Sequence, residues 1–225
     1  WAGQTGHGRA QILYYIAENL SARATELARR LIATTGASED AAAQEVDATI
    51  DRLFTYAAWA DKYDGAIHGT PLRAVTLAVP EPIGVIAIVC PDEHPLLACV
   101  ASMAAAICVG NTVVLVPSER HPLAAADLYQ VLDTSDLPGG VVNIVTGARD
   151  ALAKVLAEHN DVDAIWYFGG VAGSAMVERA SASNLKQTWV SYGEPRQWLR
   201  PAPRESAIFL RHATQIKNIW VPYGA

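Results

Sequence analysis

The strongest constraint on the fold is a repeated alternation of short apolar runs with helical segments between residues 83 and 192. The first run, Ile83-Gly84-Val85-Ile86-Ala87-Ile88-Val89, is apolar throughout, which is typical of a strand covered on both faces. Parallel strands need crossover connections, which helices supply. We therefore predict an α/β fold, a Rossmann-like, doubly wound parallel sheet. Its other strands are expected at 112–116, 141–145, 164–168 and 187–192, and its helices at 95–108, 122–133, 149–159 and 173–183.

The segments on either side of this alternation have a different pattern. Helical spacing of apolar residues predicts N-terminal helices over 10–34 and over 41–59, the second capped by Ser38. Residues 72–79 alternate as an exposed strand does, and Pro80-Glu81-Pro82 is expected to end it.

The last part of the chain is expected to form an arm. Pro195, Pro201 and Pro203 predict an irregular linker. Two short apolar runs, 207–210 and 218–221, then predict an exposed β-hairpin that needs a partner surface. We divide the chain into a Rossmann-like domain, 1–194, and a linker with a β-hairpin oligomerisation arm, 195–225. The strand at 72–79 is expected to join the sheet of the arm.

Composition excludes several classes of partner. Charged residues make up 18% of the chain, against roughly 25% in an average soluble domain, and the net charge is −6. An acidic chain is a poor ligand for nucleic acid or for an anionic membrane. The apolar run 96–116 is broken by Gly110-Asn111-Thr112, which favours a buried helix and strand over a membrane span. The sparse cysteines Cys90, Cys99 and Cys108 predict reduced thiols and a cytoplasmic protein.

Few residues qualify as candidates for chemistry. Gly169-Gly170-Val171-Ala172-Gly173-Ser174 follows a strand and opens a helix, so it either holds a phosphate or is a tight structural turn. Asp92-Glu93-His94 ends the first core strand, and a solvated turn is favoured there over a metal site. Cys90 has no evident histidine partner, which disfavours a nucleophilic role. We predict no metal site.

The order of motifs over residues 79–192 resembles the aldehyde dehydrogenase superfamily. The N-terminal helices and the terminal arm fit the same layout, so the resemblance covers nearly the whole chain. The motifs that carry it are Glu81-Pro82-Ile83-Gly84-Val85-Ile86, Gly110-Asn111-Thr112-Val113-Val114, Leu137-Pro138-Gly139-Gly140-Val141-Val142-Asn143 and Val162-Asp163-Ala164-Ile165. The resemblance implies that residues 1–194 are an NAD-binding-like domain.

Departures from the family pattern point away from catalysis. The resemblance places Glu93 where the family has an asparagine of the oxyanion hole, and Ser191 where it has the general-base glutamate. A carboxylate repels a developing oxyanion, and serine is no base near neutral pH. Val116 replaces a lysine that holds the adenosine ribose. Glu119, Gly169 and Gly170 remain as vestigial cofactor-binding candidates, so NAD is expected to bind weakly and no cofactor tightly.

Between Tyr192-Gly193-Glu194 and the arm there is no room for the family's catalytic domain, which we expect to be absent. The layout resembles the truncated C-terminal domain of family 16 aldehyde dehydrogenases, and an abrupt start at Trp1 fits a piece of a longer polypeptide. The resemblance implies a non-catalytic domain that packs against a full aldehyde dehydrogenase domain of the same polypeptide, or a second subunit, through residues 206–222. The alternative is a nucleotide-binding regulatory domain. The parent polypeptide would be an NAD-dependent aldehyde dehydrogenase.

Overall fold

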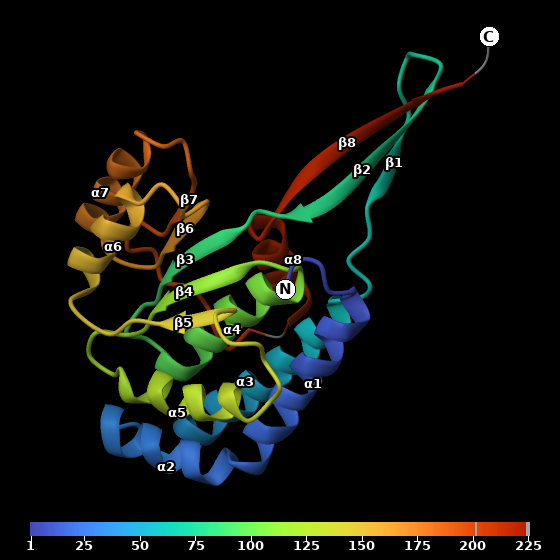
Figure 1. The fold of residues 1–225 in the computed structure, drawn as a ribbon. Helices are drawn as coiled ribbons and strands as arrows, with labels where there is room; N and C mark the ends of the chain where they lie inside the picture. Colours follow the sequence, from blue (N-terminus) through green and yellow to red (C-terminus); the bar gives the residue numbers. More distant parts are fainter. Residues whose placement is uncertain (201, 224–225) are drawn as a thin grey trace.

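The computed structural model describes residues 1–200 and 202–223, with the side chains of 202–204 left out. Helices and a parallel sheet form a layered body from which a β-arm projects (Figure 1). Pro201, expected in the linker, lies outside the described residues. The helices are α1 (Gly6–Ala22), α2 (Ala24–Thr35), α3 (Glu39–Trp59), α4 (Pro95–Cys108), α5 (Leu123–Asp133), α6 (Arg149–Glu158), α7 (Val171–Ser181) and α8 (Ala202–His212). The strands are β1 (Ala66–His68), β2 (Ala74–Pro82), β3 (Val85–Val89), β4 (Thr112–Val116), β5 (Val142–Ile144), β6 (Ala164–Tyr167), β7 (Gln187–Val190) and β8 (Thr214–Pro222).

The body is a five-stranded parallel sheet with the order β5-β4-β3-β6-β7. The chain leaves β3 toward one edge of the sheet and later returns to add β6 and β7 on the other side. This topology confirms the predicted doubly wound α/β fold. One hydrophobic cluster joins the sheet to α1–α5 and α8, and a second joins the opposite face to α6 and α7.

The fully buried helix α4 and strand β4 match their predicted ranges of 95–108 and 112–116. Ser38 caps α3 as expected, because its side chain accepts the N–H of Ala41. The predicted helix 10–34 is instead two helices that meet at Arg23. The apolar spacing continues through this break, so periodicity alone could not reveal it.

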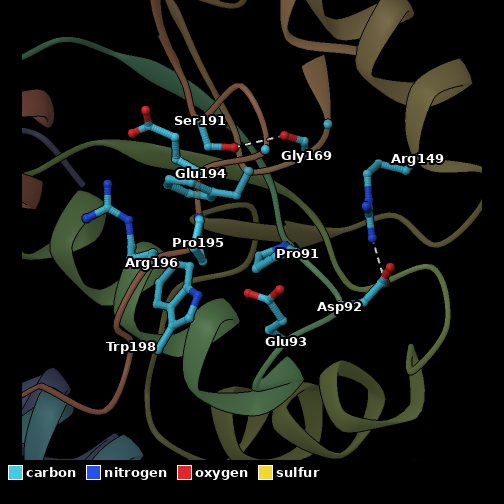
Figure 2. Close-up of a pocket in the computed structure, with 13 residues that line it drawn as sticks. Pro91, Asp92, Glu93, Arg149, Gly169, Ser191, Glu194, Pro195, Arg196 and Trp198 are labelled. Carbon is cyan, nitrogen blue, oxygen red and sulfur yellow. Dashed lines mark hydrogen bonds and ion pairs between the residues drawn. The ribbon is translucent and has the colours of Figure 1, made fainter. Parts of the chain in front are cut away.

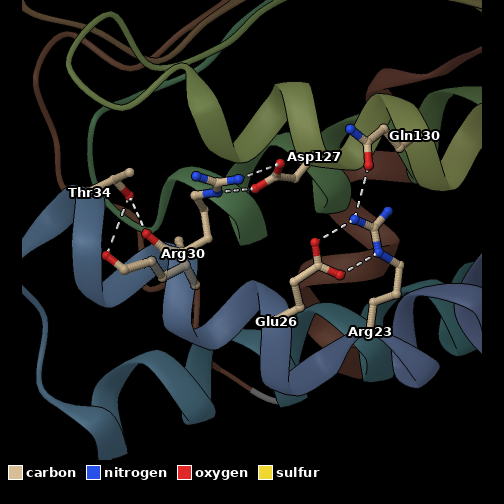
Figure 3. Close-up of polar contacts among 7 residues, drawn as sticks. Arg23, Glu26, Arg30, Thr34, Asp127 and Gln130 are labelled. Carbon is tan, nitrogen blue, oxygen red and sulfur yellow. Dashed lines mark hydrogen bonds and ion pairs between the residues drawn. The ribbon is translucent and has the colours of Figure 1, made fainter.

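Two ion pairs connect α2 with its surroundings (Figure 3). The Arg23 guanidinium bonds Glu26 in the first turn of α2 and Gln130 on α5, at 2.8–3.0 Å. Arg30 bonds the buried carboxylate of Asp127 on α5 at 2.7 Å. Arg23 thus fixes the break against α5, and Arg30 fixes the second half of α2 against the same helix.

The arm differs from the expected hairpin. Residues 207–210, predicted as a strand, belong to α8. Ser206, Phe209 and Leu210 are buried in this helix, as is Ala213 directly after it, and their spacing is helical. The short apolar run was therefore wrongly interpreted as a strand, because its buried neighbours at positions 206 and 213 were left out of the pattern.

The remaining strand, β8, pairs along its whole length with β2 in an antiparallel ladder. With β1 on the other side of β2, the arm is a three-stranded sheet of order β1-β2-β8. The N–H of Tyr223 donates to the carbonyl of Arg73 at 3.0 Å. Because ladder bonds alternate along a strand, the odd-numbered residues of β2 bond β8. The backbone nitrogens of Pro80 and Pro82 therefore point toward the β1 side, where β1 pairs only with residues 76–78 and no donor is needed. For this reason β2 continues through the two prolines that were expected to end it.

Strands β2 and β8 of the arm meet the body at one buried side chain, Asn111. Its Oδ1 accepts the N–H of Gly84 at 2.9 Å, and its Nδ2 donates to Ala106 and Ala213 at 2.9 and 2.8 Å. Gly84 follows β2 and has a φ of +134°, while Ala213 precedes β8. Asn111 is fully buried, so the amide joins the two ends of the arm and the C-terminus of α4 without competition from water.

We predict that Asn111→Ala lowers the free energy of unfolding by about 3 kcal/mol, because several buried backbone groups lose their partner. Chemical denaturation measures the change. Asn143→Ala on β5 is a matched control. Its side chain also bonds backbone carbonyls, at 2.9 and 3.4 Å, but the residue is exposed, and its loss should cost under about 1 kcal/mol. Equal losses for the two variants would contradict the role of Asn111.

Candidate functional site

A cavity of about 220 Å³ lies at the carboxyl end of the parallel sheet. It sits where β3 and β6 lead in opposite directions, the position at which ligands usually bind in such sheets. The loops after β3, β6 and β7 supply its walls, together with Arg149 at the start of α6 (Figure 2). The lining residues are Pro91, Asp92, Glu93, Arg149, Phe168, Gly169, Gly170, Ser191, Gly193, Glu194, Pro195, Arg196 and Trp198.

Four of the residues singled out in the sequence come together here. Glu93, Gly169, Gly170 and Ser191 all line the cavity. The Glu93 carboxylate points toward the cavity (Figure 2). The Ser191 hydroxyl donates to the carbonyl of Gly169 at 2.9 Å, so its proton is already engaged with the backbone.

Asp92 lines the cavity beside Arg149 and holds the surrounding loops together. Its carboxylate pairs with Arg149 at 2.6 Å and accepts the Ser118 hydroxyl at 2.7 Å. Partial burial by itself would raise the pKa of Asp92, but the bonds from Ser118 and Arg149 outweigh it and lower the pKa. Arg149 was missed in the sequence. A basic residue at the start of a predicted helix, shortly after a core strand, was the available signal.

Glu119, the vestigial candidate for ribose binding, does not line the cavity. Its Oε2 accepts the N–H of Arg149 at 3.1 Å. That N–H opens α6, which has no side-chain cap from its own N-cap residue, Ala148. Glu119 therefore caps a helix. Val116, the last residue of β4 and three residues before Glu119, is fully buried in the cluster beneath α6 and α7.

The Tyr167 side chain leaves no room for a side chain at two of the three glycines after β6. A Cβ atom at Gly169 would lie 2.5 Å from the Tyr167 ring, and one at Gly173 would meet its hydroxyl even more closely. The Tyr167 hydroxyl donates to Asp150 on α6 at 2.6 Å. Burial, and then the Asp150 carboxylate, raise the pKa of Tyr167. Close packing thus accounts for Gly169 and Gly173, while Gly170 has open space around its α-carbon.

The segment after β7 crosses the carboxyl end of the sheet and covers one side of the cavity. Trp198 is buried and packs edge-on against Phe168, with ring centroids 5.4 Å apart. Arg196 lies over the Trp189 ring at 4.7 Å and pairs with Glu205 of α8 at 2.9 Å.

A buried arginine of α3 holds the same segment from below. Arg52 donates to the carbonyls of Trp198 and Arg200 at 3.0 and 2.8 Å. Residues 195–200, predicted to form a linker, are therefore a fixed wall of the site.

His94 completes the turn after β3 and begins α4. It stands 3.6 Å from the buried carboxylate of Glu45 on α3, which also accepts the N–H groups of Leu96 and Leu97 at 2.9 and 3.2 Å. The bond to Glu45 raises the pKa of His94. The turn predicted to be merely solvated is thus tied to α3.

The three cysteines are free and fully buried, as predicted. The Sγ atoms of Cys90 and Cys99 lie 3.6 Å apart. Burial raises the pKa of the Cys90 thiol well above its usual value. A buried thiol that stays protonated is a poor nucleophile. Among the described residues, no group of three or more His, Cys, Asp or Glu side chains is placed to hold a metal ion. No helix of the described chain is long and apolar enough to cross a membrane.

The fold and the position of the cavity define an α/β domain of the nucleotide-binding type. A sequence profile of the aldehyde dehydrogenase family matches residues 1–194. The chain therefore belongs to the aldehyde dehydrogenase family.

Individual relatives agree with this assignment. The NADP/NAD-dependent aldehyde dehydrogenase PuuC of Escherichia coli is 32% identical over 86% of this chain and 39% of that protein. The betaine aldehyde dehydrogenase of Bacillus subtilis is 31% identical over 92% of this chain and 43% of that protein. A crystal structure of betaine aldehyde dehydrogenase from Staphylococcus aureus in complex with NAD⁺ superposes with a TM-score of 0.80 at 25% identity. It covers 84% of this chain and 39% of that one. The chain thus spans about two fifths of the length of these relatives.

We predict that His94 stabilises the fold at acidic pH. A histidine whose pKa is raised in the folded state contributes fully below its unfolded pKa near 6.5, and the contribution disappears as the pH rises through the folded pKa. The unfolding free energies of the wild type and of His94→Asn should therefore differ most near pH 5.5 and converge above the folded pKa. Asparagine tolerates the left-handed backbone of this position, where φ is +47°. A difference that grows with rising pH would contradict the assigned contact with Glu45.

Proposed function

We propose that this chain is a non-catalytic aldehyde dehydrogenase-like domain with a structural, assembly role. The observation that carries the proposal is the chemistry of the cavity. Glu93 brings a carboxylate where an oxyanion donor would be needed, and the Ser191 hydroxyl is held by Gly169. Neither group can assist acyl transfer.

The thiols support the same proposal. The reaction implied by the family resemblance needs an accessible thiolate. Cys90, Cys99 and Cys108 are fully buried, and none of them lines the cavity. We propose that the catalytic domain itself is absent, because only a short linker separates Glu194 from α8.

Weak NAD binding is the second part of the proposal. The Staphylococcus aureus relative is described with NAD⁺ bound. The residues of this chain do not fit a tightly held dinucleotide at the corresponding sheet edge. Glu119 caps α6, and Val116 is apolar and buried. Arg149 and residues of the segment 194–198 line the cavity itself.

For partners, we propose the arm. Residues 206–222 would dock on a full aldehyde dehydrogenase domain of the same polypeptide or on a second subunit. The support is that β8 has exposed apolar side chains, among them Ile216, Trp220 and Val221, that remain outside both hydrophobic clusters of the described residues. Exposed apolar strands of this kind usually have a partner surface.

A nucleotide-binding regulatory domain is the second candidate. Two observations favour it: the cavity lies at the usual ligand position of the sheet, and Gly170 at the N-terminus of α7 leaves open space. The strength of NAD binding separates the two proposals.

We predict that the chain oxidises no aldehyde. NADH production from several short aldehydes should stay at the level of a heat-denatured sample. The double variant Glu93→Asn, Ser191→Glu introduces the oxyanion donor and the general base that the family pattern implies. It should remain inactive, because the buried thiols cannot attack. Turnover by the wild type that persists after repurification would contradict the proposal.

We further predict that NAD binds with a dissociation constant well above the low micromolar range. Removing charge-assisted bonds to the ribose forfeits roughly 1.5–3 kcal/mol each. Isothermal titration measures the constant, with the Staphylococcus aureus betaine aldehyde dehydrogenase as a positive control under the same conditions. A low micromolar constant for this chain would instead support the regulatory candidate.

A further inference from the structure

Three buried polar groups have no hydrogen-bond partner in the described chain at the place where α3 packs against α8. They are Nη1 of Arg52, the hydroxyl of Tyr56 and the hydroxyl of Ser206. Arg52 is 5% exposed, and Tyr56 and Ser206 are 0% exposed, so bulk water does not reach these groups. Buried polar groups in native proteins nearly always have a partner, and a cluster without one needs an explanation.

The three groups belong to one small region of the interface. Arg52 and Tyr56 are four residues apart on α3 and therefore lie on the same face of this helix. Burial raises the pKa of Tyr56, and the Arg52 charge and the Ser206 hydroxyl both oppose this effect, so both lie beside the phenol. Neither hydroxyl has a hydrogen bond of normal geometry. The three groups are thus neighbours that do not satisfy one another.

The positive charge of Arg52 has no carboxylate partner among the described residues. Its Nη2 donates to two neutral carbonyls, those of Trp198 and Arg200, and no ion pair of the described residues includes Arg52. The acidic neighbour Glu205 already pairs with Arg196 at 2.9 Å. One carboxylate therefore stands against two arginines. A buried charge without compensation is strongly destabilising.

The chemistry of the cluster selects an acceptor that carries a negative charge. A guanidinium N–H can only donate, and each hydroxyl can donate its proton to the same acceptor. The three side chains are closely packed and closed to solvent, which favours a monatomic anion over sulfate or phosphate. A water molecule would also accept a bond from Arg52, but it would leave the charge of the guanidinium uncompensated.

We propose that Arg52, Tyr56 and Ser206 form a binding site for one halide ion, which in ordinary salt solution is chloride. The ion accepts a hydrogen bond from each of the three groups and compensates the charge of Arg52. Because Arg52 also holds the carbonyls of residues 198 and 200, the bound ion stabilises α8 and the wall of the cavity against α3. This inference is independent of the proposed assembly role.

Unfolding at different chloride concentrations tests the site. Sodium chloride replaces sodium gluconate at constant ionic strength, since gluconate is too large for a closed site. A ligand that binds only the folded state raises the folding equilibrium constant in proportion to its concentration, once this exceeds the dissociation constant. Chemical denaturation should therefore show a rise that approaches tenfold for each tenfold increase in chloride. An equal constant at every chloride concentration would overturn the proposal.

Matched variants separate the site from general salt effects. Tyr56→Phe and Ser206→Ala each remove one hydroxyl and should weaken the dependence on chloride. Arg52→Met removes the charge at similar side-chain length and should abolish it. The control is Arg23→Met, because Arg23 has its own carboxylate partner in Glu26, and this variant should keep the wild-type dependence. A dependence on chloride that is equal in the wild type and in Tyr56→Phe would also contradict the site.

Bromide locates the ion without any variant, since it replaces chloride in a halide site. Crystals of the wild-type chain grown in sodium bromide and measured at the bromine absorption edge should give an anomalous peak in contact with Arg52 Nη1 and the two hydroxyls. A water molecule at this position gives no anomalous signal. Electron density there without an anomalous peak would overturn the proposal.

Discussion

The buried amide of Asn111 is the interaction on which the arrangement of body and arm depends. The chain leaves the body after residue 59, runs out and back through β1 and β2, and returns to β2 again as β8. Asn111 fixes the base of the arm, because its single side chain bonds both the turn after β2 and the residue before β8. Its burial keeps these bonds free from exchange with water.

The candidate site shows how neighbouring side chains can redirect the residues of a binding edge. Tyr167 packs against Gly169 and Gly173, so these glycines serve packing as well as any ligand. Arg149 is held by Asp92, and its own backbone N–H is capped by Glu119. The two acidic side chains, Asp92 and Glu119, thus stabilise the loops around the cavity through Arg149. The function we propose follows from this use of the residues.

The sequence predicted the parallel sheet well because buried strands and helices are local, periodic features. β4 and α4 lie at their expected residues, and Glu93, Gly169, Gly170 and Ser191 do line one cavity. The arm was harder to predict. Residues 207–210 are too few to distinguish a strand from a helix without knowing which neighbours are buried. The partner of β8 lies more than 130 residues away in the chain, and no local pattern reports such a pairing. Arg149 and Arg52 were missed for the same reason, since their roles depend on contacts distant in sequence.

Amide hydrogen exchange of β8, resolved residue by residue by NMR, tests the central claim that this strand closes the arm on one edge and offers the other for assembly. The account predicts that Lys217, Ile219 and Val221, whose N–H groups bond β2, are protected at every protein concentration. The amides of Ile216, Asn218 and Trp220, which point away from β2, should exchange rapidly in the isolated chain and become protected when the partner domain or subunit is bound. Rapid exchange of these three amides in the presence of the partner as well, or equal exchange of odd and even residues, would contradict the account.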